Sequence, residues 1–227
     1  MHAFYLHGFT SSPRSTKARF FEDRFAEIGV RLHVPDFNRP DFSTLTVSRM
    51  LTQLEAAARA LPVEPLLLVG SSLGGFVAWH AASRWQRRGP AAPLVRGLVL
   101  LAPALEFGAN GARELGDVRL AEWARTGWTT VHHIAYGGER RVHYALYDDA
   151  LQYDSWAAPV SAPALVFMGA RDSVVDPEMV QRFADAHAGI SLTMLDDEHQ
   201  LLGHLDDIWR RTVPFLASLG GDGPRPA

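Results

Sequence analysis

The feature that most constrains the fold of this chain is a glycine-rich turn between an apolar segment and a helix-forming segment. The apolar run Leu66–Val69 leads into Gly70-Ser71-Ser72-Leu73-Gly74-Gly75, and helix-forming residues 76–79 follow directly. This order predicts a strand, a sharp turn and a helix, with Ser72 at the tip of the turn. Glycines two residues on either side let neighbouring backbone pass close to Ser72, because they carry no Cβ atom. The helix would point its amide groups toward an anion formed beside Ser72.

Short apolar segments alternate with helix-length segments along most of the chain. Strands are predicted at Ala3–Leu6, Arg31–Val34, Leu66–Val69, Leu98–Leu101, Ala164–Met168 and Ser191–Leu195. Helices are predicted at about Ser15–Ile28, Thr44–Ala60, Gly75–Arg87, Pro177–Ala186 and Leu205–Leu219. Alternation of this kind is typical of an α/β fold, in which helices cover both faces of a mainly parallel sheet. The 227 residues, of which 47% are hydrophobic, fit a single domain, expected to span residues 1–219.

One interval, between Pro103 and Pro163, shows no strand pattern and interrupts the alternation. We expect a helical cap inserted after the fourth strand, over about residues 104–162. The cap is rich in aromatic residues, which can form its own small core, an apolar acyl pocket, or both. They are Phe107, Trp123, Trp128, Tyr136, Tyr144, Tyr147, Tyr153 and Trp156. The tail, residues 220–227, is rich in glycine and proline and is expected to be disordered.

Composition narrows the possible partners. The chain has no cysteine, which excludes disulfides, thiolate metal sites and a cysteine nucleophile. Its formal net charge of −3, with both signs mixed, gives no basic stripe for nucleic acid. No apolar run approaches the roughly 18 residues that span a bilayer, and no signal-peptide pattern is present. We expect a cytoplasmic monomer or homodimer that acts on a small molecule.

Two later loops offer the acid and the base that a serine nucleophile needs. Asp172 and Asp176 follow the fifth predicted strand. Asp176 stands directly before Pro177, as a helix N-cap does, so Asp172 is the preferred acid. His199 and His204 follow the last strand, and His199 is the preferred base because it comes first, whereas His204 begins or precedes the terminal helix. Seven further histidines lack metal-ligand spacing: His2, His33, His80, His132, His133, His143 and His187. We therefore predict no metal, and the proposed chemistry needs no cofactor.

These features resemble the α/β-hydrolase superfamily, and more narrowly the small bacterial esterases of the YqiA type. The narrower resemblance rests on Tyr5-Leu6-His7-Gly8-Phe9, Ser11-Ser12-Pro13, Lys17-Ala18 and the turn at residues 70–75. In such enzymes, backbone amides after the His-Gly pair and after the nucleophile form an oxyanion hole. The resemblance therefore implies Phe9 and Leu73 as these donors. It also implies that the His7 ring braces its loop, and it leaves Ser71 a packing or supporting role.

The resulting hypothesis is a serine hydrolase with the catalytic triad Ser72, Asp172 and His199. The favoured reaction is hydrolysis of short- to medium-chain carboxylic esters, because an apolar, aromatic cap suits such acyl groups. An acyl-thioesterase is the nearest alternative, although the insertion holds eight carboxylates against five arginines and so shows no basic cradle for coenzyme A phosphates. Peptidase, lactonase and carbon–carbon hydrolase activities also stay open. A non-catalytic ligand-binding member of the fold is a further alternative.

Overall fold

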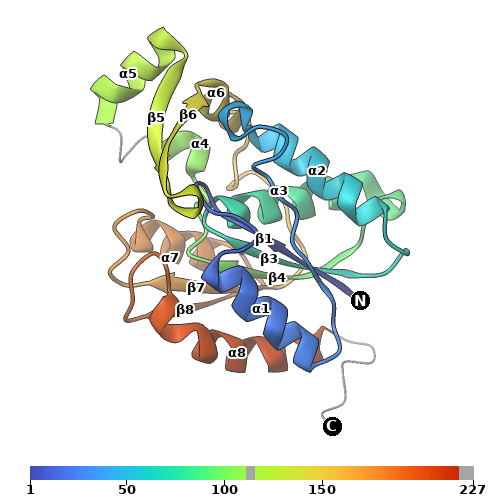
Figure 1. The fold of residues 1–227 in the computed structure, drawn as a ribbon. Coiled ribbons are helices and arrows are strands. Elements are labelled where there is room, and N and C mark those ends of the chain that lie inside the picture. Colours follow the sequence, from blue (N-terminus) through green and yellow to red (C-terminus); the bar gives the residue numbers. More distant parts are fainter. Residues whose placement is uncertain (111–115, 220–227) are drawn as a thin grey trace.

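The computed structural model describes residues 1–110 and 116–219. Six strands form one sheet in the order β2-β1-β3-β4-β7-β8, and every neighbouring pair is parallel (Figure 1). This arrangement confirms the predicted fold class. The strands are β1 His2–Leu6, β2 Leu32–His33, β3 Leu66–Ser71, β4 Val95–Leu101, β7 Ala164–Gly169 and β8 Ile190–Leu195. The predicted disorder of residues 220–227 falls outside the described residues.

Helices cover both faces of the sheet (Figure 1). On one face lie α1 (Thr16–Glu27) and α8 (Leu205–Ser218), and on the other lie α2 (Val47–Arg59), α3 (Leu73–Arg88) and α7 (Pro177–Ala186). All residues of β3 and β7 are buried as a result. This burial explains why these strands read as continuous apolar runs in the sequence.

Side-chain caps fix where three of the helices begin. The hydroxyl of Ser15 accepts a hydrogen bond from the Ala18 N–H at the start of α1. Thr46 caps α2 in the same way. Asp176 accepts from the Glu178 N–H, with Pro177 in the first turn of α7, which confirms the N-cap predicted for Asp176.

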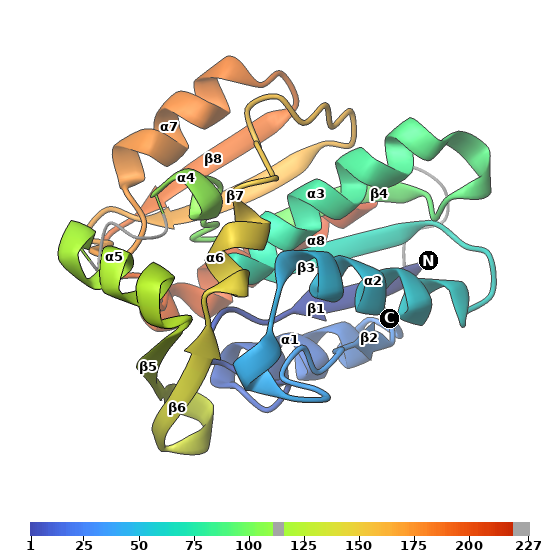
Figure 2. The ribbon, with the colours of Figure 1, turned by 90° about the horizontal axis from the view of Figure 1, so that it is seen from above.

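The insertion between β4 and β7 lies beside the carboxyl edge of the sheet (Figure 2). It contains α4 (Phe107–Asn110), α5 (Gly116–Thr126), β5 (Trp128–His133), β6 (Gly138–His143) and α6 (Ala145–Ala150). β5 and β6 form an antiparallel pair, so the prediction that this interval lacks strands is wrong. The pair escaped prediction because it is largely polar and its residues are exposed or half-buried, except for the buried Val142 and His133. The extent of a cap over about residues 104–162 stays a prediction.

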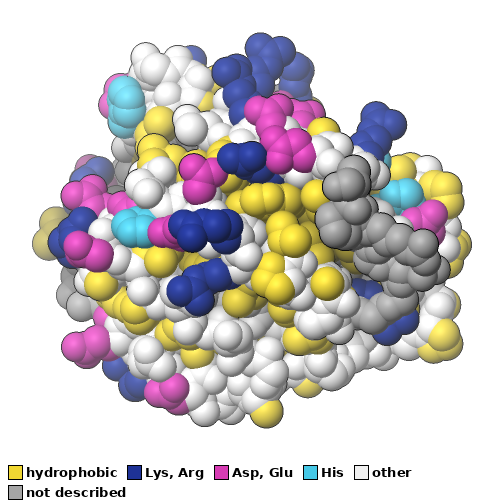
Figure 3. Space-filling model, turned by 90° about the horizontal axis from the view of Figure 1, so that it is seen from below, with side chains coloured by type: hydrophobic (Ala, Val, Ile, Leu, Met, Phe, Trp, Pro, Cys, Tyr) yellow, Lys and Arg dark blue, Asp and Glu magenta, His cyan; other side chains and the backbone are white. Residues whose placement is uncertain are grey.

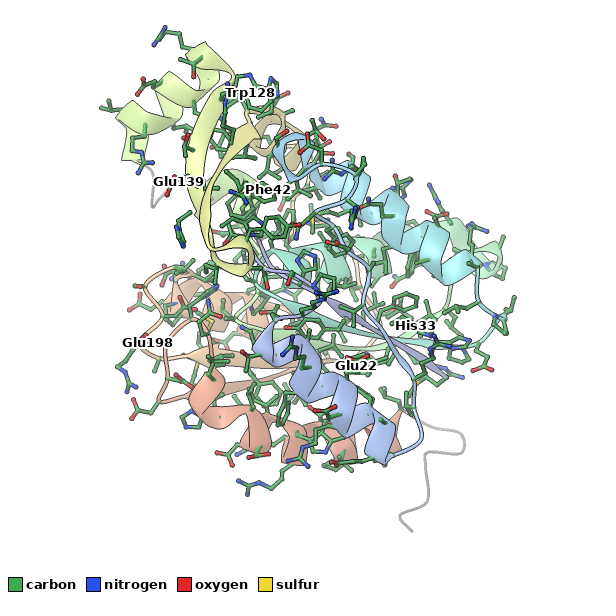
Figure 4. All side chains as sticks on the ribbon, viewed as in Figure 1. Glu22, His33, Phe42, Trp128, Glu139 and Glu198 are labelled. Carbon is green, nitrogen blue, oxygen red and sulfur yellow. The ribbon has the colours of Figure 1, made fainter. Side chains whose placement is uncertain are left out.

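Specific contacts attach the β5–β6 hairpin to the body of the protein. The Ala135 N–H, at the hairpin tip, donates to the Thr10 carbonyl at 3.1 Å. Beneath the hairpin, the Phe42 ring meets His133 edge to face, with centroids 4.5 Å apart (Figure 4). After the hairpin, Asp149 on α6 accepts from the Ser48 hydroxyl at 2.6 Å. The hairpin is therefore held over the loop that follows β1.

Charges of both signs are interspersed on the face shown in Figure 3. This view agrees with the mixed charge pattern in the sequence. Among the described residues, no helix combines the length and apolar character that a membrane crossing requires.

Candidate active site

Ser72 stands between β3 and α3 in a strained backbone conformation. Its φ of 54° and ψ of −119° lie in a region that residues other than glycine rarely adopt. Its N–H donates to the Leu101 carbonyl at 2.9 Å, and its carbonyl accepts from the Ala104 N–H at 3.2 Å. The turn is thus held from β4, which compensates a strain of about 1–3 kcal/mol.

Glycines bring the loop after β1 against this turn. A Cβ atom at Gly74 would lie 2.0 Å from the Leu6 carbonyl oxygen, so a side chain there would displace β1. A Cβ atom at Gly8 would lie 3.2 Å from the Ser72 Cβ. The loop after β1 therefore passes directly beside Ser72, as the sequence resemblance implies.

Asp172 and His199 meet across two neighbouring loops. Asp172 Oδ2 lies 2.8 Å from His199 Nδ1, and the Asp172 side chain is fully buried. Asp172 Oδ1 accepts from the N–H groups of Val174 and Val175 at 2.8 and 2.9 Å. Three contacts thus fix one carboxylate, and this carboxylate in turn orients the imidazole.

Ser72 lies at the same edge of the sheet as Asp172 and His199, because it follows β3 and they follow β7 and β8. The structure gives no hydrogen bond between the Ser72 hydroxyl and His199, both of which it describes. In ligand-free enzymes such a bond is often long and tightens when substrate binds.

The competing histidine, His204, has a different partner. Its Nδ1 lies 3.0 Å from Asp197 Oδ2, which also accepts from the Gly203 N–H. Asp197 Oδ1 accepts from the Glu198 N–H at 2.8 Å. Asp197 therefore shapes the loop that carries His199, and sequence reasoning missed this role. Glu198 itself points away from the body of the protein (Figure 4).

The His7 ring contacts two backbone groups. Its Nε2 accepts from the Phe37 N–H at 3.1 Å, which places the proton on Nδ1, 3.0 Å from the Gly8 carbonyl. Burial lowers the pKa of His7, so the ring is neutral. These contacts fit the bracing role that the resemblance implies.

Two backbone amides beside Ser72 are available to a ligand. Within the described part of the chain, the N–H groups of Phe9 and Leu73 donate to no protein acceptor. Both residues, like Ser72, line a cavity of about 250 Å³. Ser71 points elsewhere, because its hydroxyl interacts with that of buried Tyr5.

The cavity lies between the insertion and α7, and its walls are mainly apolar. The hairpin contributes Thr129, Val131 and Val142; other elements contribute Leu146, Val174, Val175 and Met179. Three of the aromatic residues singled out in the sequence, Phe107, Trp123 and Tyr147, line it as well. The charged residues that line it are Glu106, Asp176 and Arg182.

No group of three or more histidines and carboxylates with metal-binding geometry occurs among residues 1–110 and 116–219. The adjacent His132 and His133 lie on opposite faces of β5, the first exposed and the second buried.

Solved structures with this arrangement define the class of protein. The chain is similar to mouse alpha/beta hydrolase domain-containing protein 10, with a TM-score of 0.78 and 19% identity, over 96% of this chain and 90% of that one. It is similar to a protein from Agrobacterium vitis S4 assigned as a hydrolase, with a TM-score of 0.76 and 25% identity, over 93% and 86% of the two chains. A third is Est1E from Butyrivibrio proteoclasticus with bound ferulic acid, with a TM-score of 0.74 and 21% identity, over 96% and 88%. The fold is that of the α/β-hydrolase superfamily.

Within this superfamily, the chain belongs to UPF0227, described as an uncharacterised protein family, whose model matches residues 2–216. The narrower resemblance, to YqiA-type proteins, is thereby confirmed. A search of curated protein sequences gave no match.

Proposed function

We propose that this protein is a serine hydrolase, and specifically a carboxylesterase that cleaves short- to medium-chain acyl esters. The observation that carries the proposal is the position of Ser72. It is a strained turn residue that lines an apolar cavity, at the sheet edge where Asp172 and His199 are paired. A serine, a histidine and a buried carboxylate are the groups that nucleophilic acyl transfer requires.

In the proposed mechanism, His199 Nε2 takes the proton from Ser72 as its Oγ attacks the acyl carbonyl. Asp172 holds the Nδ1–H and stabilises the imidazolium that forms. The amides of Phe9 and Leu73 bind the oxyanion of the tetrahedral intermediate. His199 then protonates the departing alcohol, and water repeats the sequence on the acyl-enzyme.

The cavity supports an ester with an apolar acyl group. About 250 Å³ of mainly apolar space adjoins Ser72, and the hairpin forms one wall of it. The structurally similar Est1E binds ferulic acid, a carboxylic acid. Both observations favour an acyl group that enters the cavity while its carbonyl lies beside Ser72.

A fluorophosphonate probe followed by a substrate panel tests the proposal. The probe should label the wild type and leave Ser72→Ala unlabelled, with Ser71→Ala as the matched control that keeps its label. Equal labelling of wild type and Ser72→Ala, or labelling of neither, would contradict it and favour the non-catalytic alternative. Hydrolysis of p-nitrophenyl esters from acetate to palmitate should exceed that of matched acyl-thioesters; the reverse order would identify an acyl-thioesterase.

A further inference from the structure

Lys17 is the only lysine in the sequence. The chain holds 22 lysine and arginine residues in total, and all the others are arginines. Lys17 is 7% exposed, whereas none of the arginines that the structure describes is buried. Lysine and arginine differ chemically at a buried position, because a lysine there can lose its proton near neutral pH and an arginine cannot.

The fold places Lys17 beside the carboxyl edge of the sheet. It lies in the first turn of α1, whose start is fixed by the Ser15 cap, and it shares the buried face of the helix with Ala18, Phe21 and Phe25. Since α1 is the next element after β1, its first turn is at the edge where the loops after β7 and β8 also lie.

Two carboxylates act on the charge of Lys17, and each belongs to one of these loops. Asp172 comes from the loop after β7, and Asp197 comes from the loop after β8. Burial outweighs their attraction and lowers the pKa of Lys17 to about 8. In the described part of the chain, Lys17 forms no direct ion pair with either carboxylate, so it acts on them through space.

The two carboxylates help to position His199, the base of the proposed triad. Asp172 binds His199, and Asp197 accepts hydrogen bonds from the Glu198 and Gly203 N–H groups. The loops also bond to each other, since the Arg171 N–H donates to the Asp197 carbonyl at 3.0 Å. One carboxylate therefore binds His199 directly, and the other shapes the loop that carries it.

Stability alone gives no reason for a lysine at this position. Burial of an ammonium group costs free energy, and for Lys17 that cost exceeds the attraction of the two carboxylates, since the pKa of Lys17 is lowered. The advantage of the charge must therefore lie in what it does to its neighbours.

We propose that Lys17 is a positioning residue of the reaction described above, an inference that rests on the proposed function. Its buried ammonium group offsets the charges of Asp172 and Asp197 and so counteracts the effect of the Asp172 charge on His199. A positive charge near a histidine disfavours its imidazolium form, so loss of the Lys17 charge should raise the pH at which the reaction loses its base.

Other charged groups surround this cluster and enter the pH argument. Buried Tyr5, which interacts with Ser15, has a raised pKa and stays neutral. The exposed Arg171 pairs with Asp196, and α1 is tied to α8 by the ion pair of Arg24 and Asp206. His204 pairs with Asp197, whose pKa is lowered by hydrogen bonds from His204 and from the loop.

The first experiment uses the single lysine as its own probe. Protein labelled with lysine that carries ¹³C at Cε gives one lysine NMR signal, whose titration midpoint should lie near pH 8, below the ordinary value of about 10.4. Asp172→Asn and Asp197→Asn should each lower the midpoint, because each removes an attracting charge. The control, Asp196→Asn, changes an exposed neighbour and should leave it unchanged. A wild-type midpoint near 10.4, or a midpoint that is the same in the wild type and in both aspartate variants, would overturn the proposal.

The second experiment asks whether the charge acts on the reaction. Lys17→Met keeps the length of the side chain and removes the charge, so the acid limb of the kcat/KM profile should move up by about half to one pH unit. Activity on that limb should fall about three- to tenfold, while the free energy of unfolding is unchanged or higher. Arg19→Met, on the exposed side of α1, should leave the profile in place.

Restoration of the charge gives the decisive comparison. Because the chain has no cysteine, Lys17→Cys places a single thiol that 2-bromoethylamine can alkylate in the unfolded chain, with loss of bromide, to give an amine close to lysine. After refolding, this product should recover the wild-type acid limb, and a 1-bromopropane adduct should not. Equal profiles for the two adducts would reduce Lys17 to a packing role. Absence of hydrolysis by the wild type would instead overturn the proposed function, and the NMR titration would still report the charge coupling.

Discussion

Asp172 binds His199 directly, with 2.8 Å between Oδ2 and Nδ1, although the two residues stand 27 positions apart in the sequence. The other Asp172 oxygen accepts two backbone N–H groups of its own loop. A carboxylate held at both oxygens cannot rotate, so it fixes the imidazole in one orientation and one tautomer.

Replacement of Asp172 by asparagine should therefore cost activity far more than stability. We expect Asp172→Asn to lower kcat by roughly 10³–10⁴-fold on p-nitrophenyl esters, because an amide favours the wrong tautomer of His199. Asp176→Asn is the matched control, since asparagine caps a helix as well as aspartate does, and it should keep more than a tenth of the activity. The reverse order of losses would move the acid role to Asp176.

His199 and His204, in the loop after β8, should also differ in how much their loss lowers activity and stability. His199→Ala should lower kcat by roughly 10⁴–10⁶-fold, as loss of the general base does in other triads. His204→Ala removes a hydrogen bond to Asp197, so it should cost about 1 kcal/mol of stability and less than tenfold in kcat. Kinetics and urea unfolding of both variants measure this, and a larger kcat loss for His204→Ala would reverse the assignment.

Much of the candidate site was accessible to sequence reasoning because its residues are tied to chain order. A parallel sheet brings the carboxyl ends of β3, β7 and β8 to one edge. Once the alternation of strands and helices is recognised, Ser72, Asp172 and His199 are therefore expected at that edge. Lys17 and Asp197 escaped this reasoning, since their importance depends on distances between loops. The signal available for Lys17 was its uniqueness among the basic residues.

The sheet was predictable because its strands have a clear sequence pattern, whereas the β5–β6 hairpin has none. Buried parallel strands such as β3 are apolar throughout and therefore visible in the sequence. β5 and β6 lie over a cavity with their other face in solvent, and β6 reads Gly-Glu-Arg-Arg-Val-His. The burial of Val142 depends on the body beneath it, so tertiary contact decides this element.

The strain at Ser72 makes a prediction about stability. Ser72→Gly and Ser72→Ala both remove the nucleophile, but only glycine relieves the positive φ. Ser72→Gly should therefore be more stable than Ser72→Ala by about 1 kcal/mol in urea unfolding, with no activity in either. Equal stability would mean that the turn in solution is less strained than the structure indicates.

The cavity predicts a change in chain-length preference. Leu146 is 1% exposed and lines the cavity, so Leu146→Trp should fill part of the space and shift the preferred p-nitrophenyl ester toward acetate. Leu151→Trp changes a residue just after α6 that is 53% exposed, and it should leave the preference unchanged. The ratio of kcat/KM across the ester series is the measurement. A shift of equal size in both variants would place the acyl group elsewhere.

His133 predicts how stability depends on pH. Its buried ring meets Phe42 and Tyr136, and neither ring nitrogen has a hydrogen-bond partner among the described residues. Burial, and then the charge of Arg140, lower the pKa of His133 from its ordinary 6.5 to about 4. Between about pH 4 and pH 6.5, the unfolded chain binds a proton at His133 that the folded chain does not bind. Stability must therefore fall as pH drops through this window, and this contribution vanishes above about pH 6.5.

His133→Phe should remove that dependence and keep the ring contacts. Unfolding by urea should show a gain in stability for His133→Phe that is about 1–2 kcal/mol larger at pH 5 than at pH 8. A smaller gain should persist at pH 8, because phenylalanine leaves no polar atom buried without a partner. His132→Phe, on the exposed face of the same strand, should show no such difference between the two pH values. An equal effect of His133→Phe at both would mean that the His133 ring is already protonated in the folded protein or is reached by water.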